Sequence, residues 1–209
     1  MEGFMNILHE TEKDKYYLVL DEDQLNKEFI HFVHTLDGVV DVGHFRGAYK
    51  SSKIFEIRKY FNRVEFIAIN TSYYFDTNSP LSKASKANIN ESVLASVEIL
   101  HKDEKTESIL IKADDIFLSE SLYQIKPAPN PNIKPGMRFS LGSLNKKKCQ
   151  YVSINNYPLN SDVAVKYVFD NPMPMNRGGP GITDPRSVNL VIQHSFIEVP
   201  ENNYTPRYD

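Results

Sequence analysis

The sequence contains one cysteine, no tryptophan and no long apolar run. The single cysteine, Cys149, excludes an intrachain disulfide and a zinc site built from several cysteines. No stretch approaches the roughly 18 apolar residues of a membrane-spanning helix, so no membrane span is predicted. The first residues, 1–4, lack a basic region followed by an apolar core, so no export signal is expected within this chain.

Charge of either sign is also not gathered into a long block along the sequence. The 24 basic and 27 acidic residues give a net charge of -3 without a long block of one sign. Nucleic-acid-binding proteins usually carry a basic patch or an elevated isoelectric point, so no nucleic-acid partner is predicted. The 41% of hydrophobic residues is typical of a folded globular protein.

Apolar residues recur mainly with a period of two, which is the pattern of strands with one buried face. We therefore predict a mainly β fold of antiparallel sheets, sandwich-like or strongly curved, with about eight or nine strands and one or two short helices. The clearest hairpin joins residues 53–60 and 64–69. Asn62 is the turn residue expected to adopt a left-handed backbone. Both arms carry apolar residues on both faces, which predicts a central place in the sheet.

Two short helices and two long loops interrupt the strands. Ser79 and Pro80 are typical of a helix start, and Asp114-Asp115 is expected to cap one helical turn. The proline-rich segments 126–136 and 171–186 are predicted to be loops inside a single domain, 1–209.

The last apolar segment shows a change of phase. Val188, Leu190 and Ile192 alternate, and the apolar run then continues through Phe196 and beyond. A bulge or bend is therefore expected around His194.

No catalytic motif emerges from the histidines. His9-Glu10 is followed by Lys13 where a zinc-protease helix needs its second histidine. His31 and His34 lie in a predicted strand, where a separation of three places them on opposite faces, so one buried and one exposed imidazole is expected. A Gly-rich stretch, 178–181, contains a proline where a phosphate-binding loop needs backbone N–H donors. No cofactor or metal site is predicted within the chain.

Other reactive side chains are also assigned no catalysis. Cys149 has no neighbouring signature, and adjacent carboxylates such as Asp114-Asp115 are commonly helix caps. Aromatic residues are abundant, with 12 Tyr and 12 Phe, and most are expected in the core. The best candidate for an exposed binding platform is the sequence Tyr73-Tyr74-Phe75 at a strand-to-loop junction.

Four stretches that together span nearly the whole chain carry a family resemblance: YLVLDEDQLNKEF at 17–29, FRG with the hairpin KIFEIRKYFNRVEFIAIN at 45–70, ESVLASVEIL with ILIKADDIFLSE at 91–120, and SVNLVIQHSFIEVPENNYTPRYD at 187–209. In order and content they resemble the N-terminal domain of unknown function of bacterial zinc-dependent metalloproteases, which precedes a metzincin-like catalytic domain. No single stretch is a chemical motif, so the resemblance depends on their number and order.

The resemblance implies an exported parent protein, periplasmic or extracellular, that acts on protein or peptide substrates. Its zinc and its H-E-x-x-H helix would lie in a catalytic domain downstream of Asp209, and this chain would pack against that domain and shape its substrate cleft. Tyr208 and Asp209 belong to the expected junction, and Arg207 is the residue expected to pair with a carboxylate across it.

Two other hypotheses remain open. A free-standing β-sandwich module for adhesion or for glycan or protein binding would use Tyr73–Phe75 or the loop 171–185. A cryptic metal or hydrolase site is the third hypothesis, and no motif in the sequence supports it.

Overall fold

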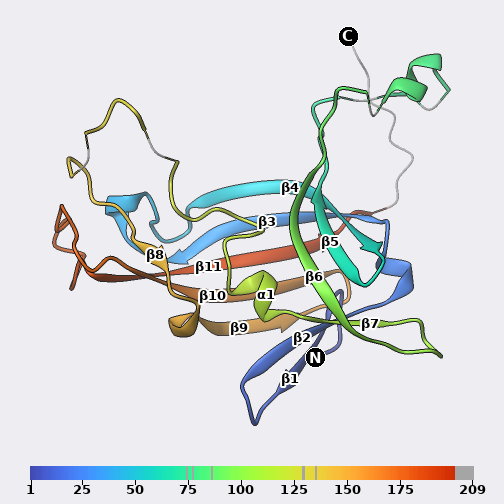
Figure 1. Cartoon of the computed structure of the whole chain (residues 1–209), viewed down its shortest axis with the longest axis horizontal. Helices are drawn as coiled ribbons and strands as arrows, with labels where there is room; N and C mark the ends of the chain where they lie inside the picture. The colour runs from blue at the N-terminus through green and yellow to red at the C-terminus, as the bar shows by residue number, and fades with distance from the viewer. Residues whose placement is uncertain (74, 77, 86, 129, 135, 201–209) are drawn as a thin grey trace.

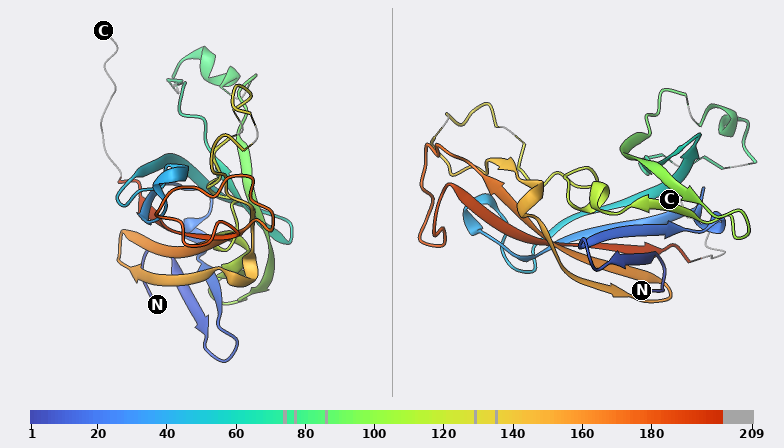
Figure 2. Two further views of the ribbon diagram at one scale, coloured as in Figure 1. Left: turned by 90° about the vertical axis from the view of Figure 1, so that its left-hand side faces the viewer. Right: turned by 60° about the horizontal axis from the view of Figure 1, so that its bottom comes forward.

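The computed structural model describes residues 1–73, 75, 76, 78–85, 87–128, 130–134 and 136–200. In this part of the chain eleven strands form one sheet in which every neighbouring pair is antiparallel. The order is β1-β2-β7-β6-β5-β4-β3-β11-β10, and β8 and β9 both pair with β10. The sheet is strongly curled (Figures 1 and 2), which confirms the predicted fold class in its curved form.

The described strands are β1 Asn6–Glu10, β2 Lys15–Leu20, β3 Glu28–Asp37, β4 Tyr49–Tyr60, β5 Arg63–Ala68, β6 Ser92–Lys102, β7 Ile109–Lys112, β8 Ser143–Leu144, β9 Gln150–Asn156, β10 Asn160–Asp170 and β11 Ser187–Glu198. One α-helical turn, α1 (Asp114–Phe117), and four short 3-10 helices accompany them: η1 Glu22–Gln24, η2 Val40–Val42, η3 Pro80–Ala84 and η4 Lys146–Lys148. Ser79 caps η3 by accepting a hydrogen bond from the Leu81 amide, with Pro80 at the first helical position as predicted.

The N-terminal segment before β1 is hydrogen-bonded to the end of β9 and the start of β10, at the other edge of the sheet. The Phe4 amide donates to the Tyr157 carbonyl at 2.8 Å, and the Met5 amide donates to Ser161 Oγ at 2.9 Å. The Asn156 side chain donates to the Met5 carbonyl at 2.6 Å. Backbone groups that an open edge would leave unpaired are thereby satisfied at this end of the sheet.

The core lies on the concave face. Alternate residues of β10 point inward, and Val163, Val165, Tyr167 and Phe169 are all buried. Helix α1 inserts Ile116 and Phe117 into the same interior, so the curl is filled with side chains. Burial of large apolar side chains contributes about 1.5–3 kcal/mol each, and this interior is the main source of stability.

Strands β4 and β5 form the predicted hairpin and lie centrally in the sheet, as expected. Tyr60 pairs with Arg63, so the turn consists of Phe61 and Asn62 alone. The left-handed backbone falls on Phe61, with φ of 52°, and not on Asn62. Eleven strands are described where about eight or nine were predicted. β8 has only two residues and β9 is largely polar, so neither shows a clear apolar alternation.

The molecule is elongated, and its long loops gather at opposite ends (Figures 1 and 2). The segment between β5 and β6 projects at one end. The turn between β3 and β4, the described part of 126–142 and the loop 171–186 lie at the other. The described residues of 126–136 and the whole of 171–186 contain no helix or strand, as predicted.

Candidate functional site

A chain of buried polar side chains crosses the interior beneath α1. His31 Nε2 lies 3.0 Å from His194 Nδ1, and His194 Nε2 lies 2.8 Å from the Tyr167 hydroxyl. Tyr167 in turn donates to the Phe117 carbonyl at 2.7 Å. β3, β11 and β10 supply the three side chains, and each is almost fully buried, with His194 only 2% exposed.

The direction of the hydrogen bonds in this chain is fixed by its last acceptor. The Phe117 carbonyl can only accept, so Tyr167 donates its proton there and accepts from Nε2–H of His194. His194 Nδ1 is then free to accept from Nε2–H of His31. His194 is therefore neutral with its proton on Nε2, and His31 donates from its own Nε2–H.

Burial is the main reason that both rings stay neutral. It lowers the pKa of His194 to about 4. The pKa of His31 is also well below its usual value, first through burial and then through the proximity of His194 and Lys53. Burial likewise raises the pKa of the Tyr167 hydroxyl well above its usual value. The arrangement holds protons in fixed positions in a closed interior, which suits a structural role.

The bulge predicted around His194 was wrong in position. Val188, Leu190, Ile192, His194 and Phe196 are all buried, so one phase runs through the strand without a break. The register shift between β11 and β3 lies earlier, between Val191 and Ile192. His194 can occupy a core position because both of its ring nitrogens are hydrogen-bonded. The signal in the sequence was that His194 falls on the same every-second-residue spacing as Leu190, Ile192 and Phe196.

The prediction that His31 and His34 lie on opposite faces of one strand is confirmed. His31 points into the core, and His34 lies half-buried on the opposite face of β3. His9 stacks on Tyr16 with ring centroids 4.1 Å apart and lies 2.9 Å from Asp14 Oδ1. Within the described residues, no group of three or more His, Cys, Asp or Glu side chains is arranged to hold a metal ion.

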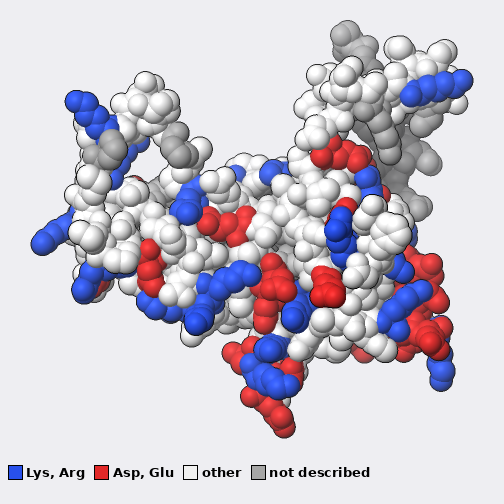
Figure 3. All heavy atoms as spheres, in the orientation of Figure 1, with Lys and Arg blue, Asp and Glu red and all other residues white. Residues whose placement is uncertain are grey.

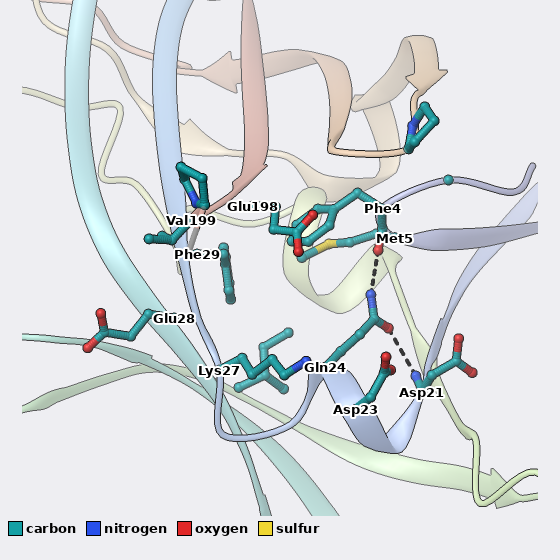
Figure 4. A pocket seen from close by; sticks show the side chains of 14 residues that line it. Phe4, Met5, Asp21, Asp23, Gln24, Lys27, Glu28, Phe29, Glu198 and Val199 are labelled. Atoms are coloured by element: carbon teal, nitrogen blue, oxygen red, sulfur yellow. Dashed lines mark hydrogen bonds between the residues drawn. The ribbon is translucent and has the colours of Figure 1, made fainter. Parts of the chain in front are cut away.

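A cavity opens at the end of the sheet where β11 finishes (Figure 4). It has a volume of about 590 Å³ and is lined by residues of the N-terminal segment, of η1 with the turn that follows it, and of 198–200. Phe4, Met5, Phe29 and Ile57 form its apolar lining. This volume falls in the range that holds small ligands or protein side chains.

Charged groups surround this apolar lining. Lys27 runs along the same wall as Gln24 and Asp23, and Glu198 lies across from them beside Phe4 and Met5 (Figure 4). Gln24 is fixed by donating to the Phe4 carbonyl and by accepting from the Asp21 amide at 3.0 Å. Within the described residues, Asp23, Lys27 and Glu198 form no side-chain hydrogen bond or ion pair. The cavity therefore offers an apolar surface with unneutralised carboxylates, which is suited to binding a basic, partly apolar group.

The other residues singled out from the sequence are dispersed. Tyr73 is 63% exposed and Phe75 is half-buried, while Tyr74 lies outside the described residues. Arg207, Tyr208 and Asp209 also lie outside the described residues. The cap expected at Asp114-Asp115 was wrong, because Ala113 is the N-cap residue of α1 and no side chain caps this turn. The Asp114 carboxylate instead accepts from the Tyr151 hydroxyl at 3.0 Å. Cys149 is buried. Tyr73 does not line the cavity.

Comparison with known families identifies the chain. The model of the domain of unknown function DUF5117 matches residues 47–209. The chain belongs to the DUF5117 family. The matched region begins just before β4 and includes β10 and β11 with Tyr167 and His194, while β1, β2, β3 and His31 precede it. The cavity therefore lies between residues before the match and residues within it.

No curated protein and no solved structure matches the chain. Among the described residues, no helix has the length and apolar character needed to cross a membrane.

Proposed function

We propose that this DUF5117 chain is a non-catalytic accessory domain of an exported zinc-dependent metalloprotease, and that it packs against the catalytic domain and shapes its substrate cleft. The zinc and the catalytic residues belong, in this proposal, to that separate domain. The resemblance of the four stretches supplies the enzyme class, and periplasmic or extracellular localisation is part of the same proposal.

The cavity beside the end of β11 is the observation that carries the docking part of the proposal. Glu198, Val199 and Pro200 line it, so the chain passes the cavity directly before residues 201–209, where the junction is expected. A neighbouring domain tethered at this point would meet the cavity at a high effective concentration. Its apolar lining and free carboxylates suit a Lys or Arg side chain of that domain, because the aliphatic stem packs on Phe29 and the charge meets Glu198.

Charge reversal in the full-length polypeptide tests this docking. We expect Glu198→Lys combined with Asp23→Lys to lower peptidase activity several-fold, because the incoming basic group would face two cations. The matched control is Glu104→Lys combined with Glu12→Lys, two exposed carboxylates on the β6–β7 and β1–β2 turns. Equal activity of the cavity variant and the control would refute docking at this cavity.

Arg207 remains the predicted interdomain partner of a carboxylate. In the full-length polypeptide, Arg207→Ala is expected to lower activity or to weaken the association of the two domains. Activity and resistance to proteolysis at the junction that both equal wild type would refute this role.

A second function has one specific observation in its favour. Tyr73 and Leu81, both largely exposed, lie on the segment between β5 and β6 that projects from the sheet, as in a protruding binding loop. A free-standing module that binds glycans or proteins would retain ligands on a glycan or matrix-protein array, and Tyr73→Ser would abolish that retention. An array without signal would remove this alternative.

A further inference from the structure

The end of the molecule opposite the β5–β6 segment carries exposed apolar side chains on three separate segments. We define this loop end as residues 38–46, 133–140 and 171–186, described except for residue 135. Val40, Met173 and Met175 are 73%, 86% and 77% exposed, and Phe45 and Met137 are also largely exposed. A monomeric protein seldom leaves this many large apolar side chains in water at one end without a binding role.

The three segments contact one another and form one structure. The Gly179 amide donates to Asp41 Oδ1 at 2.7 Å, which joins the 171–186 loop to η2. The Asn176 side chain donates to the Gly136 carbonyl at 3.1 Å and joins the two proline-rich loops. The Asn171 amide donates to the Arg186 carbonyl at 2.8 Å and closes the base of the 171–186 loop. The exposed apolar residues are therefore held on a common scaffold.

The charge of the loop end is opposite to that of the whole chain. It contains five basic residues and two acidic ones, although the chain as a whole has a net charge of -3. Lys and Arg accordingly predominate at the left-hand end in Figure 3. Both acids are already engaged, because Asp41 accepts from Gly179 and Asp184 pairs with Arg186. Lys134, Arg138 and Arg177 have no acidic partner within the described residues.

We propose that the loop end binds the surface of an anionic lipid bilayer, with the apolar side chains inserted among the headgroups and the basic side chains on the lipid phosphates. Membrane-surface binding combines apolar insertion with electrostatic attraction, and one of these alone gives only marginal affinity. The apolar residues stand on protruding segments at the tip of an elongated molecule, which suits a flat, deformable surface. This proposal does not depend on the proposed function.

Vesicle co-sedimentation with the 209-residue chain tests the proposal. We expect binding to phosphatidylcholine vesicles that contain phosphatidylglycerol, weaker binding to pure phosphatidylcholine, and loss of binding in high salt because salt screens the charges. Arg138→Gln with Arg177→Gln should weaken binding by about five-fold for each charge removed. The matched control is Lys83→Gln with Lys105→Gln, two exposed lysines outside the loop end.

The apolar contribution is tested separately with Met173→Ser and Met175→Ser, which are expected to reduce vesicle binding while leaving the unfolding transition unchanged. The control is Leu81→Ser, an exposed apolar residue at the other end of the molecule. Absence of binding to anionic vesicles in low salt would overturn the proposal. Binding that is insensitive to the methionine variants and is matched by binding to soluble polyglutamate would also overturn it, and would indicate an acidic protein surface as the partner.

Discussion

Protonation of the buried His31–His194 pair is predicted to destabilise the fold in mild acid. At neutral pH, Nε2–H of His31 donates to Nδ1 of His194, and Nε2–H of His194 donates to Tyr167. A proton added to Nδ1 of His194 would place two N–H donors against each other across 3.0 Å between two buried side chains. The folded state therefore resists the proton that the unfolded state accepts readily.

The size of the effect follows from the pKa of His194. This pKa falls from its ordinary value of 6.5 to about 4 on folding, and the difference corresponds to about 3 kcal/mol of unfolding free energy. Because the folded pKa is the lower one, the unfolded chain binds more protons below pH 6.5. Stability is therefore fully present above that pH and is lost as the pH falls toward 4. His31, whose pKa is also lowered, acts in the same direction.

Urea unfolding followed by circular dichroism between about pH 4 and pH 7.5 measures this loss, since its midpoint and slope give the free energy. The His31→Phe/His194→Phe variant removes both titrating groups and leaves Tyr167 bonded to the Phe117 carbonyl. Its stability should fall by at least about 3 kcal/mol less than that of wild type over this range, because His31 adds to the contribution of His194. Burial raises the pKa of Asp114, so this carboxyl makes a contribution to the pH dependence of stability that is opposite in sign to that of the histidines. Both proteins contain Asp114, so its contribution cancels when their pH profiles are compared. Parallel pH profiles for the two proteins would refute the reasoning.

Two further substitutions test local features of the fold. A Cβ atom at Gly142 would lie 2.0 Å from the Asp170 carbonyl oxygen, so Gly142→Ala is expected to cost about 2 kcal/mol or more, and an unchanged urea midpoint would contradict the close packing. Phe61→Gly should relieve a left-handed backbone that L-residues disfavour, and should therefore stabilise the β4–β5 hairpin. The gain should be at most about 1 kcal/mol, because the substitution also removes the edge-to-face contact of Phe61 with Tyr60. A lowered melting temperature for Phe61→Gly would show that the aromatic contact outweighs the strain.

Much of the fold could be predicted because alternation of apolar residues directly reports a buried strand face. The β4–β5 hairpin, the inward residues of β10 and the two proline-rich loops all follow from local pattern and composition. β9 could not be found in this way, because most of its residues face solvent and it is held by its pairing with β10. The curl of the sheet also depends on pairings between distant segments, such as β3 with β11.

The candidate sites were harder to predict for the same reason. His31 and His194 are 163 residues apart, and only the pairing of β3 with β11 brings them together. His194 is polar and was therefore interpreted as a break in the apolar alternation, although a hydrogen-bonded imidazole can occupy a core position. The cavity likewise joins the N-terminal segment to the end of β11, and no local motif indicates it.

The central claim, that this chain is the accessory domain and not the catalytic domain of a zinc metalloprotease, is tested most directly by elemental analysis of two purified proteins at neutral pH. We expect about one zinc ion per chain in the full-length polypeptide and no stoichiometric zinc in residues 1–209. Stoichiometric zinc in the 209-residue chain, or none in the full-length polypeptide, would contradict the account.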